Sequence, residues 1–98
     1  MPMTNAMMAA PNLARIRAII LHVEQSPQFP DKWMLAMEIE EAECLSGPHF
    51  ARPALRAHAF TIRASWDLPV PVRVEAEAEY LGGARNGVFQ LKNLYPCR

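Results

Sequence analysis

The residues that most often bind metal ions or attack substrates are few in this chain of 98 residues. They are two cysteines and three histidines: Cys44, Cys97, His22, His49 and His58. Only Cys44 and His49 lie close together in the sequence, and two ligands are fewer than the four that structural zinc sites use. We therefore expect no metal site, and two free thiols in a reducing compartment.

Carboxylates alternate along one stretch, at Glu75, Glu77 and Glu79. A glycosidase needs two carboxylates across a pocket, whereas this spacing along one strand is typical of a solvated face. No nucleophile has a base that the sequence places beside it. His58 lies in an apolar register, where a packed histidine is more common than a general base. We therefore expect neither a catalytic site nor a cofactor, and an enzyme acting through His58 or Cys44 is the least favoured alternative.

Cationic side chains suggest a binding site instead. The candidate ligand-binding residues are Lys32, Arg56, Arg63, Arg85 and Asn86. Ten lysine and arginine residues are balanced by ten acidic ones, so the chain lacks the net positive charge typical of nucleic-acid-binding proteins. Glycines around Arg85 would let its loop hold the guanidinium in solvent, where Arg85 and Lys32 could grip an anionic group.

The last third of the chain predicts a β-hairpin. Residues 72–80 alternate strictly between apolar and charged side chains, and residues 88–92 form a second short run of this kind. The glycine-rich segment between them is typical of a hairpin loop. A wide loop over residues 82–87 is favoured over a tight turn, because it sets opposite charges and apolar partners against each other. This register pairs Tyr80 with Phe89, Ala78 with Leu91 and Glu77 with Lys92.

Three earlier stretches also predict strands. Residues 13–24 favour a strand with a bulge near Ile19, and a helix is the alternative. Apolar and polar positions alternate over residues 33–43 until Glu41, where we expect the strand to leave the core. The alternation resumes over residues 55–63. The side chains expected to point inward are Trp33, Leu35, Met37, Ile39, His58, Phe60 and Ile62. Those expected on the outer faces are Met34, Ala36, Glu38, Glu40, Ala57, Ala59 and Thr61.

The chain reads as one domain with a short tail. An apolar content of 51% is typical of a globular protein. Residues 1–12 carry no charged side chain and two prolines, and we expect a flexible tail before a domain that spans residues 13–98. No apolar run reaches the ~18 residues of a membrane-spanning helix. The N-terminus lacks the features of a secretory signal, so we expect a cytoplasmic protein.

Five strands, a long bulged first strand and a glycine-containing loop before the fifth resemble the OB-fold. The resemblance spans residues 13–95 and is strongest over residues 72–80, Gly82-Gly83 and residues 88–91. It implies an all-β fold, a small five-stranded antiparallel barrel. Residues 63–71 are too few and too rich in proline for a substantial helix between strands three and four. That end of the barrel would then be covered by Trp66 and Leu68, or left partly open.

In OB-folds the ligand usually lies across strands two and three, between the first-to-second and fourth-to-fifth loops. Single-stranded nucleic acid needs cations for its phosphates and exposed rings for its bases. The outer faces expected here hold no aromatic ring, which makes a poor stacking platform. The resemblance therefore implies a non-catalytic binding or adaptor module that engages another protein or a second copy of itself. The alternative is a domain that binds single-stranded nucleic acid through Lys32, Arg56, Arg63 and Arg85.

Overall fold

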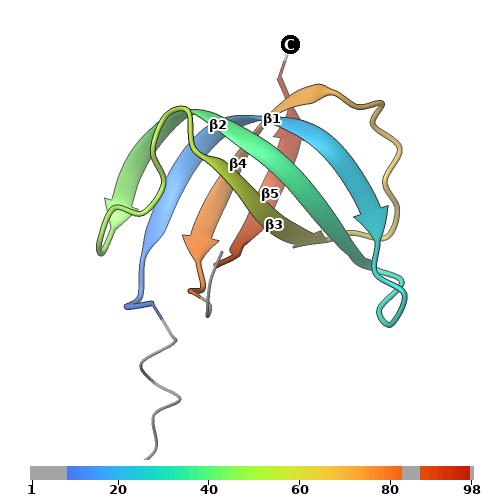
Figure 1. Cartoon of the computed structure of the whole chain (residues 1–98), viewed down its shortest axis with the longest axis horizontal. Coiled ribbons are helices and arrows are strands. Elements are labelled where there is room, and N and C mark those ends of the chain that lie inside the picture. Colours follow the sequence, from blue (N-terminus) through green and yellow to red (C-terminus); the bar gives the residue numbers. More distant parts are fainter. Residues whose placement is uncertain (1–8, 83–86, 98) are drawn as a thin grey trace, which may run out of the picture.

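The computed structural model describes residues 9–82 and 87–97, and these ranges form an all-β fold without a helix. The strands are β1 (Leu13–Gln25), β2 (Lys32–Ser46), β3 (Arg56–Ile62), β4 (Val72–Tyr80) and β5 (Phe89–Pro96), as Figure 1 shows. The predictions of five strands, and of no helix between the third and the fourth, are confirmed. In the part of the chain described, no helix has the length and apolar character needed to cross a membrane.

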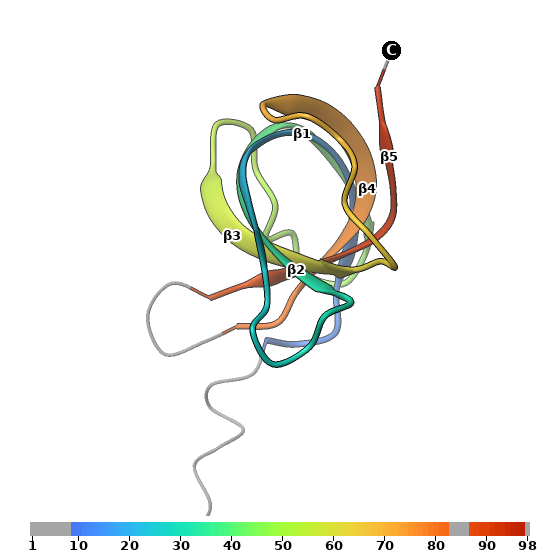
Figure 2. The same ribbon diagram turned by 90° about the vertical axis from the view of Figure 1, so that its right-hand side faces the viewer.

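The five strands close into a barrel in the order β1-β2-β3-β5-β4. Figure 2 views the ring of strands from its end. β1 pairs with β2 along one edge and with β4 along the other. One neighbouring pair, β3 with β5, is parallel over Ala59–Thr61, so the prediction of a wholly antiparallel barrel is wrong. The physical reason is that strand directions cannot alternate throughout a closed ring with an odd number of strands.

The hairpin of β4 and β5 has the predicted register. Tyr80 pairs with Phe89, Ala78 with Leu91 and Glu77 with Lys92. The Leu81 amide donates to the Val88 carbonyl at 2.9 Å, which extends the ladder to the edge of the wide loop. The prediction of this register is confirmed, while the inner part of the loop lies outside the described residues.

Two bulges keep the inner faces of β1 and β2 apolar. In β1 the register shifts between Ile20 and His22, so the predicted bulge is present and lies at Leu21, two residues beyond Ile19. In β2 an extra residue, Glu40, lies between the partners of two consecutive β1 residues. This second bulge turns Ala42 toward the core, and the strand continues to Ser46, but Glu41 and residues 43–46 are exposed, so β2 leaves most of the core at Glu41 as predicted. An extra residue changes which side every later side chain faces, because the side-chain period of a strand is two.

The faces of β3 are the reverse of the prediction. Ala59 and Thr61 are buried, whereas His58 and Ile62 are exposed and Phe60 is half-buried on the outside. Ala59 pairs with the buried Phe89, whose ring leaves room for only a small neighbour. The Thr61 hydroxyl donates to the Leu91 carbonyl at 2.9 Å, so its burial leaves no unpaired polar group.

Asn12, the last residue of the expected tail, contacts β4. Asn12 is only 9% exposed, and its side chain extends the pairing of β1 with β4. Its Nδ2 donates to the Tyr80 carbonyl at 2.9 Å, and its Oδ1 accepts from the Tyr80 amide at 2.9 Å. Asn12 is therefore part of the folded domain, because its amide offers the same donor and acceptor as a peptide group. Residues 1–8 of the expected tail lie outside the described residues.

The segment between β3 and β4 covers one end of the barrel. Trp66 packs against the core, and its Nε1 donates to the Leu68 carbonyl at 2.8 Å. Trp33 packs beside the core from β2, with its Nε1 donating to the Arg63 carbonyl at 3.2 Å. Each indole thus buries its ring and satisfies its polar N–H. These contacts agree with the expectation that residues after β3 cover the barrel end.

Candidate functional site

The outward side chains of β2 and β3 stand opposite one another in four rows. The rows are Lys32 with Ile62, Met34 with Phe60, Ala36 with His58, and Glu38 with Arg56. Because β3 presents the face that was expected to point inward, this surface holds an aromatic ring and an exposed isoleucine. The sequence-based expectation of an outer surface without a ring is therefore wrong.

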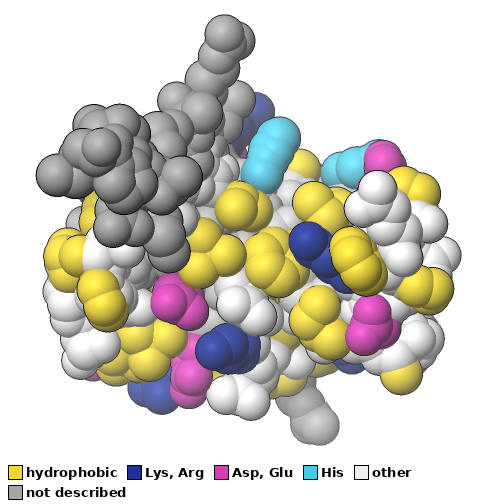
Figure 3. All heavy atoms as spheres, turned by 90° about the horizontal axis from the view of Figure 1, so that it is seen from below, with side chains coloured by type: hydrophobic (Ala, Val, Ile, Leu, Met, Phe, Trp, Pro, Cys, Tyr) yellow, Lys and Arg dark blue, Asp and Glu magenta, His cyan; other side chains and the backbone are white. Residues whose placement is uncertain are grey.

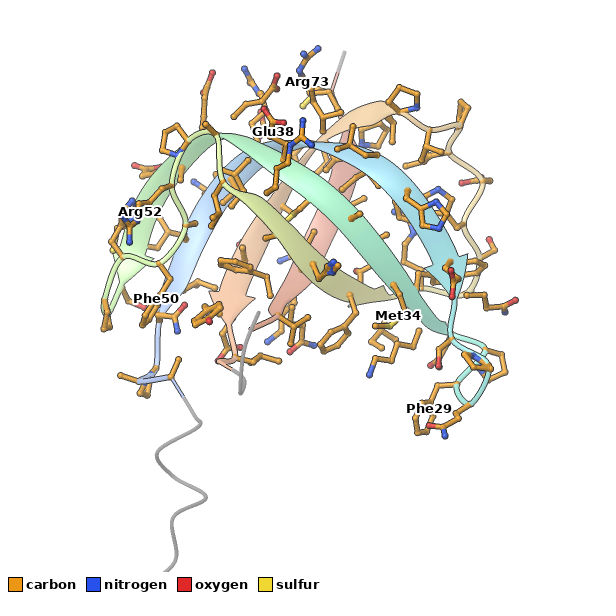
Figure 4. The ribbon with its side chains drawn as sticks, in the orientation of Figure 1. Phe29, Met34, Glu38, Phe50, Arg52 and Arg73 are labelled. Atoms are coloured by element: carbon orange, nitrogen blue, oxygen red, sulfur yellow. The ribbon has the colours of Figure 1, made fainter. Side chains whose placement is uncertain are left out.

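One end of this surface is an apolar patch, formed by Phe29, Lys32, Met34, Phe60 and Ile62. Phe29 is 54% exposed, Ile62 52% and Met34 38%. Lys32 Nζ lies 4.4 Å from the centre of the Phe60 ring and 5.8 Å from that of Phe29, within the range of cation–π contacts. Figure 4 shows Phe29 and Met34 at the same end of the barrel. Figure 3 shows hydrophobic side chains gathered over the side seen from below, with single charged groups among them.

A separate groove of about 770 Å³ lies where the β2–β3 loop meets the start of β3 and the hairpin end of β4 and β5. Its walls include Phe50, Arg52, Arg56, His58, Tyr80 and Phe89. Phe50 and Arg52 lie at the end of the barrel away from Phe29, as Figure 4 shows. The groove shares no residue with the apolar patch, so the structure presents two distinct surfaces.

Aromatic rings and cations meet in this groove. The ring centres of Phe50 and Tyr80 are 4.8 Å apart, and those of Tyr80 and Phe89 are 5.0 Å apart. Arg56 Nε lies 3.1 Å from Glu38 Oε1, which holds this guanidinium at the wall. Arg52 is exposed and forms no ion pair within the described ranges. Sequence reasoning missed Phe50 and Tyr80, since no local pattern tells a ring that lines a groove from one in the core.

The predicted ligand-binding residues are spread over different parts of the barrel. Lys32 lies in the apolar patch, and Arg56 lies in the groove, about 20 Å away along the strand direction. Arg63 follows β3, and its guanidinium carbon lies 5.4 Å from the centre of the Trp66 ring. Arg85 and Asn86 lie outside the described residues. The structure therefore places Lys32 and Arg56 on the same outer face of β2 and β3 but at opposite ends of it, one in the apolar patch and the other in the groove.

The outer face of β1, β2 and β4 holds charges that pair with each other. Arg17 Nη2 donates to Glu75 Oε2 at 2.8 Å, and the Tyr95 hydroxyl donates to Glu75 Oε1 at 2.7 Å. Arg73 binds Glu40 through two hydrogen bonds of 2.6 and 3.0 Å. The hydrogen bond from Arg17, followed by that from Tyr95, lowers the pKa of Glu75, and the bond from Arg73 lowers the pKa of Glu40. These intramolecular pairs account for the acidic residues of this face without a ligand.

The thiols and imidazoles do not gather. Cys44 and Cys97 are free, and the Cys44 thiol donates to the Gly47 carbonyl at 3.3 Å. Within residues 9–82 and 87–97, no three side chains of the metal-binding types stand close enough to hold an ion. Of the surfaces that the described residues form, the apolar patch and the groove are the candidates for binding a ligand.

Comparisons with protein-family models, with curated proteins and with solved structures find no match for this chain. Its function is therefore inferred from the chemistry of these two surfaces.

Proposed function

We propose that this chain is a small, non-catalytic, OB-like binding module that engages another protein, or a second copy of itself, through the apolar patch. A closed five-stranded barrel whose β2–β3 surface remains uncovered supports the OB-like assignment. A cytoplasmic setting belongs to the same proposal and is supported by the two free thiols.

The observation that carries the proposal is the exposure of neighbouring large apolar side chains. Phe29, Met34 and Ile62 are each more than one-third exposed, and they surround the half-buried ring of Phe60. Covering such a patch removes apolar surface from water, and phenylalanine and methionine are enriched at protein interfaces relative to the rest of the surface. The single cation of the patch, Lys32, lies over a ring, where a partner could desolvate it with little loss.

A photo-crosslinking amino acid at position 62 tests the proposal in cells. We expect a discrete crosslinked protein band from position 62 that is lost when Met34→Glu is also introduced. Leu45 is the control, because it is 39% exposed on β2 but outside the patch. Sedimentation of the purified protein then separates the two kinds of partner, since self-association would appear there as a dimer. Equal crosslinking from positions 62 and 45 would refute the proposal.

A second candidate ligand is single-stranded nucleic acid, which the contact between Lys32 and Phe60 favours. A ring beside an ammonium group offers stacking for a base and a positive charge for its phosphate. Anisotropy with a fluorescent oligonucleotide would then show affinity that falls steeply with salt, and Phe60→Ala and Lys32→Ala would each weaken it. Binding that is absent at low salt, or insensitive to both changes, excludes this candidate.

A further inference from the structure

We propose that the groove binds a planar aromatic ring that carries an anionic group, such as an aryl phosphate or a nucleoside monophosphate. The groove lies apart from the apolar patch, so this inference goes beyond the proposed function and does not depend on it.

The rings of the groove provide a surface on which a planar ligand can stack. Phe89 is buried, whereas Phe50 and Tyr80 are half-buried and line the groove with part of their rings. The planes of Phe50 and Tyr80 are tilted by 33°, an arrangement that leaves an edge or face of each ring available. Gly87 keeps the position of Tyr80 possible, because a Cβ there would lie 2.0 Å from the Tyr80 hydroxyl oxygen.

The charged side chains that line the groove are Arg52 and Arg56, and none of the described lining residues is acidic. Glu38 contacts only Nε of Arg56 and is not a lining residue, which leaves the terminal nitrogens of that guanidinium free to donate to a ligand. The chain as a whole has no net charge, and Glu40 and Glu75 are paired on another face. The local excess of cations therefore favours an anion, and guanidinium groups bind phosphate and carboxylate oxygens in pairs.

The volume of the groove distinguishes between possible anions. Sites for small organic ligands typically occupy about 300–1,000 Å³, and the groove has about 770 Å³. A bare inorganic anion would leave most of this space, and all of the aromatic surface, without a contact. A ring with an anionic substituent uses both the aromatic wall and the cations.

Calorimetric titration of the full chain tests the proposal with four probes: phenyl phosphate, a nucleoside monophosphate, the matching uncharged nucleoside, and inorganic phosphate. We expect the first two to bind at least tenfold more tightly than the last two. Arg52→Ala should weaken their binding at least tenfold. Arg15→Ala is the matched control, because Arg15 is an exposed arginine on β1 outside the groove, and it should leave the affinity unchanged.

Three results would overturn the proposal: no binding of either aromatic anion at millimolar concentration, equal binding of inorganic phosphate, or equal losses in Arg52→Ala and Arg15→Ala. Phe50→Ala adds a test of the ring, with circular dichroism to verify folding. If Phe50→Ala does not fold, Arg52→Ala still tests the proposal, because the Arg52 side chain is exposed and its removal should not affect folding.

The aromatic anion could be a free small molecule or one nucleotide of a single-stranded nucleic acid. Titration with a short oligonucleotide distinguishes the two. If a short oligonucleotide binds much more tightly than the monophosphate, and Arg52→Ala weakens this binding, the ligand is a single strand. Equal affinities identify a free ligand. Ile62→Glu changes the apolar patch alone, so it should leave groove binding intact even where it abolishes binding of a protein partner.

Discussion

Asn12 shows how a single side chain can extend a sheet beyond the end of a strand. Its amide binds both the N–H and the carbonyl of Tyr80, and its Nδ2 also donates to the Ala10 carbonyl at 2.8 Å. A side chain that replaces a peptide group in this way satisfies backbone atoms that would otherwise be buried without partners. The residue therefore extends the pairing of β1 with β4 by one position.

Asn12→Ala should lower the free energy of unfolding by about 1–3 kcal/mol, because it leaves buried polar groups of Tyr80 unpaired. Urea denaturation measures this change. Gln28→Ala is the control, since Gln28 is an exposed amide, and its effect should stay within about 0.5 kcal/mol. Equal effects of the two substitutions would show that Asn12 does not hold the start of β1.

Ala78 and Glu79 are neighbours in β4 with opposite environments. Ala78 is buried opposite Leu91, so Ala78→Glu should place an unpaired carboxylate in the core at a cost of several kcal/mol. Glu79→Ala should change the stability by less than about 1 kcal/mol, because Glu79 lies on the opposite face of the strand. Thermal denaturation followed by circular dichroism compares the two variants, and similar midpoints would mean that the hairpin faces are reversed.

At the scale of single elements, β3 is the strand whose orientation matters most for function. Its inner residues, Ala59 and Thr61, are small, and its outer residues are His58, Phe60 and Ile62. The inner faces of β1 and β4 are also rich in alanine, with Ala14, Ala18, Ala76 and Ala78 in the core. Small side chains let the strands approach the axis of a narrow barrel, and the interior has no room for a phenylalanine from β3.

This orientation predicts the outcome of two substitutions in β3. Ala59→Leu should overpack the core and lower the stability by about 1–3 kcal/mol or more. Phe60→Ala should cost less than the ~3–5 kcal/mol typical of a buried phenylalanine, because the ring lies on the outside. Chemical denaturation of both variants measures these costs. A larger loss of stability in Phe60→Ala than in Ala59→Leu would instead support the orientation predicted from the sequence, with Phe60 in the core.

At the scale of the whole molecule, the charges are segregated around the barrel. The outer face of β1, β2 and β4 holds acidic residues paired with Arg17 and Arg73, while the groove at the start of β3 is lined by cations. Although the net charge is zero, the two surfaces differ. The charges on the face of β1, β2 and β4 pair with each other, whereas the charged residues in the described lining of the groove are arginines. The paired charges of the first face link the stability of the fold to pH.

The paired carboxylates predict acid sensitivity. The pKa values of Glu40 and Glu75 are lowered in the folded protein by hydrogen bonds from arginine, so the unfolded chain binds protons first as the pH falls. Their contribution to stability is complete above the unfolded pKa near about 4.3, and it is lost as the pH falls through the lower folded values. Urea midpoints between pH 7 and pH 3 should therefore decline below about pH 4.5.

Glu75→Gln provides the control for this pH dependence, because it keeps the size of the side chain and removes its charge. The variant should be less stable than the natural chain at pH 7, and the difference should shrink as the pH falls to 3. A constant difference across this range would show that the ionised Glu75 does not contribute to stability.

The sequence by itself determined the strand content, the hairpin of β4 and β5, and its register. Strict alternation over residues 72–80 identifies the two faces of β4, and one face carries only charges, so the inward face is not in doubt. Pairing Glu77 with Lys92 then excludes neighbouring registers, because a shift of one residue exchanges the faces. The lack of a helix between β3 and β4 followed from the length and the prolines of residues 63–71.

Only the tertiary structure decided the orientation of β3, the parallel pair, the role of Asn12, the apolar patch and the groove. Alternation in β3 shows that Ala59 and Phe60 face opposite sides, but both faces hold apolar residues, so the pattern cannot assign the inner one. That choice depends on the volume left by Phe89 and Leu91 of β5, which lie 30 residues away in the sequence from their partners. The groove likewise joins Phe50 and Tyr80 from distant segments, and closure of the barrel brings them together.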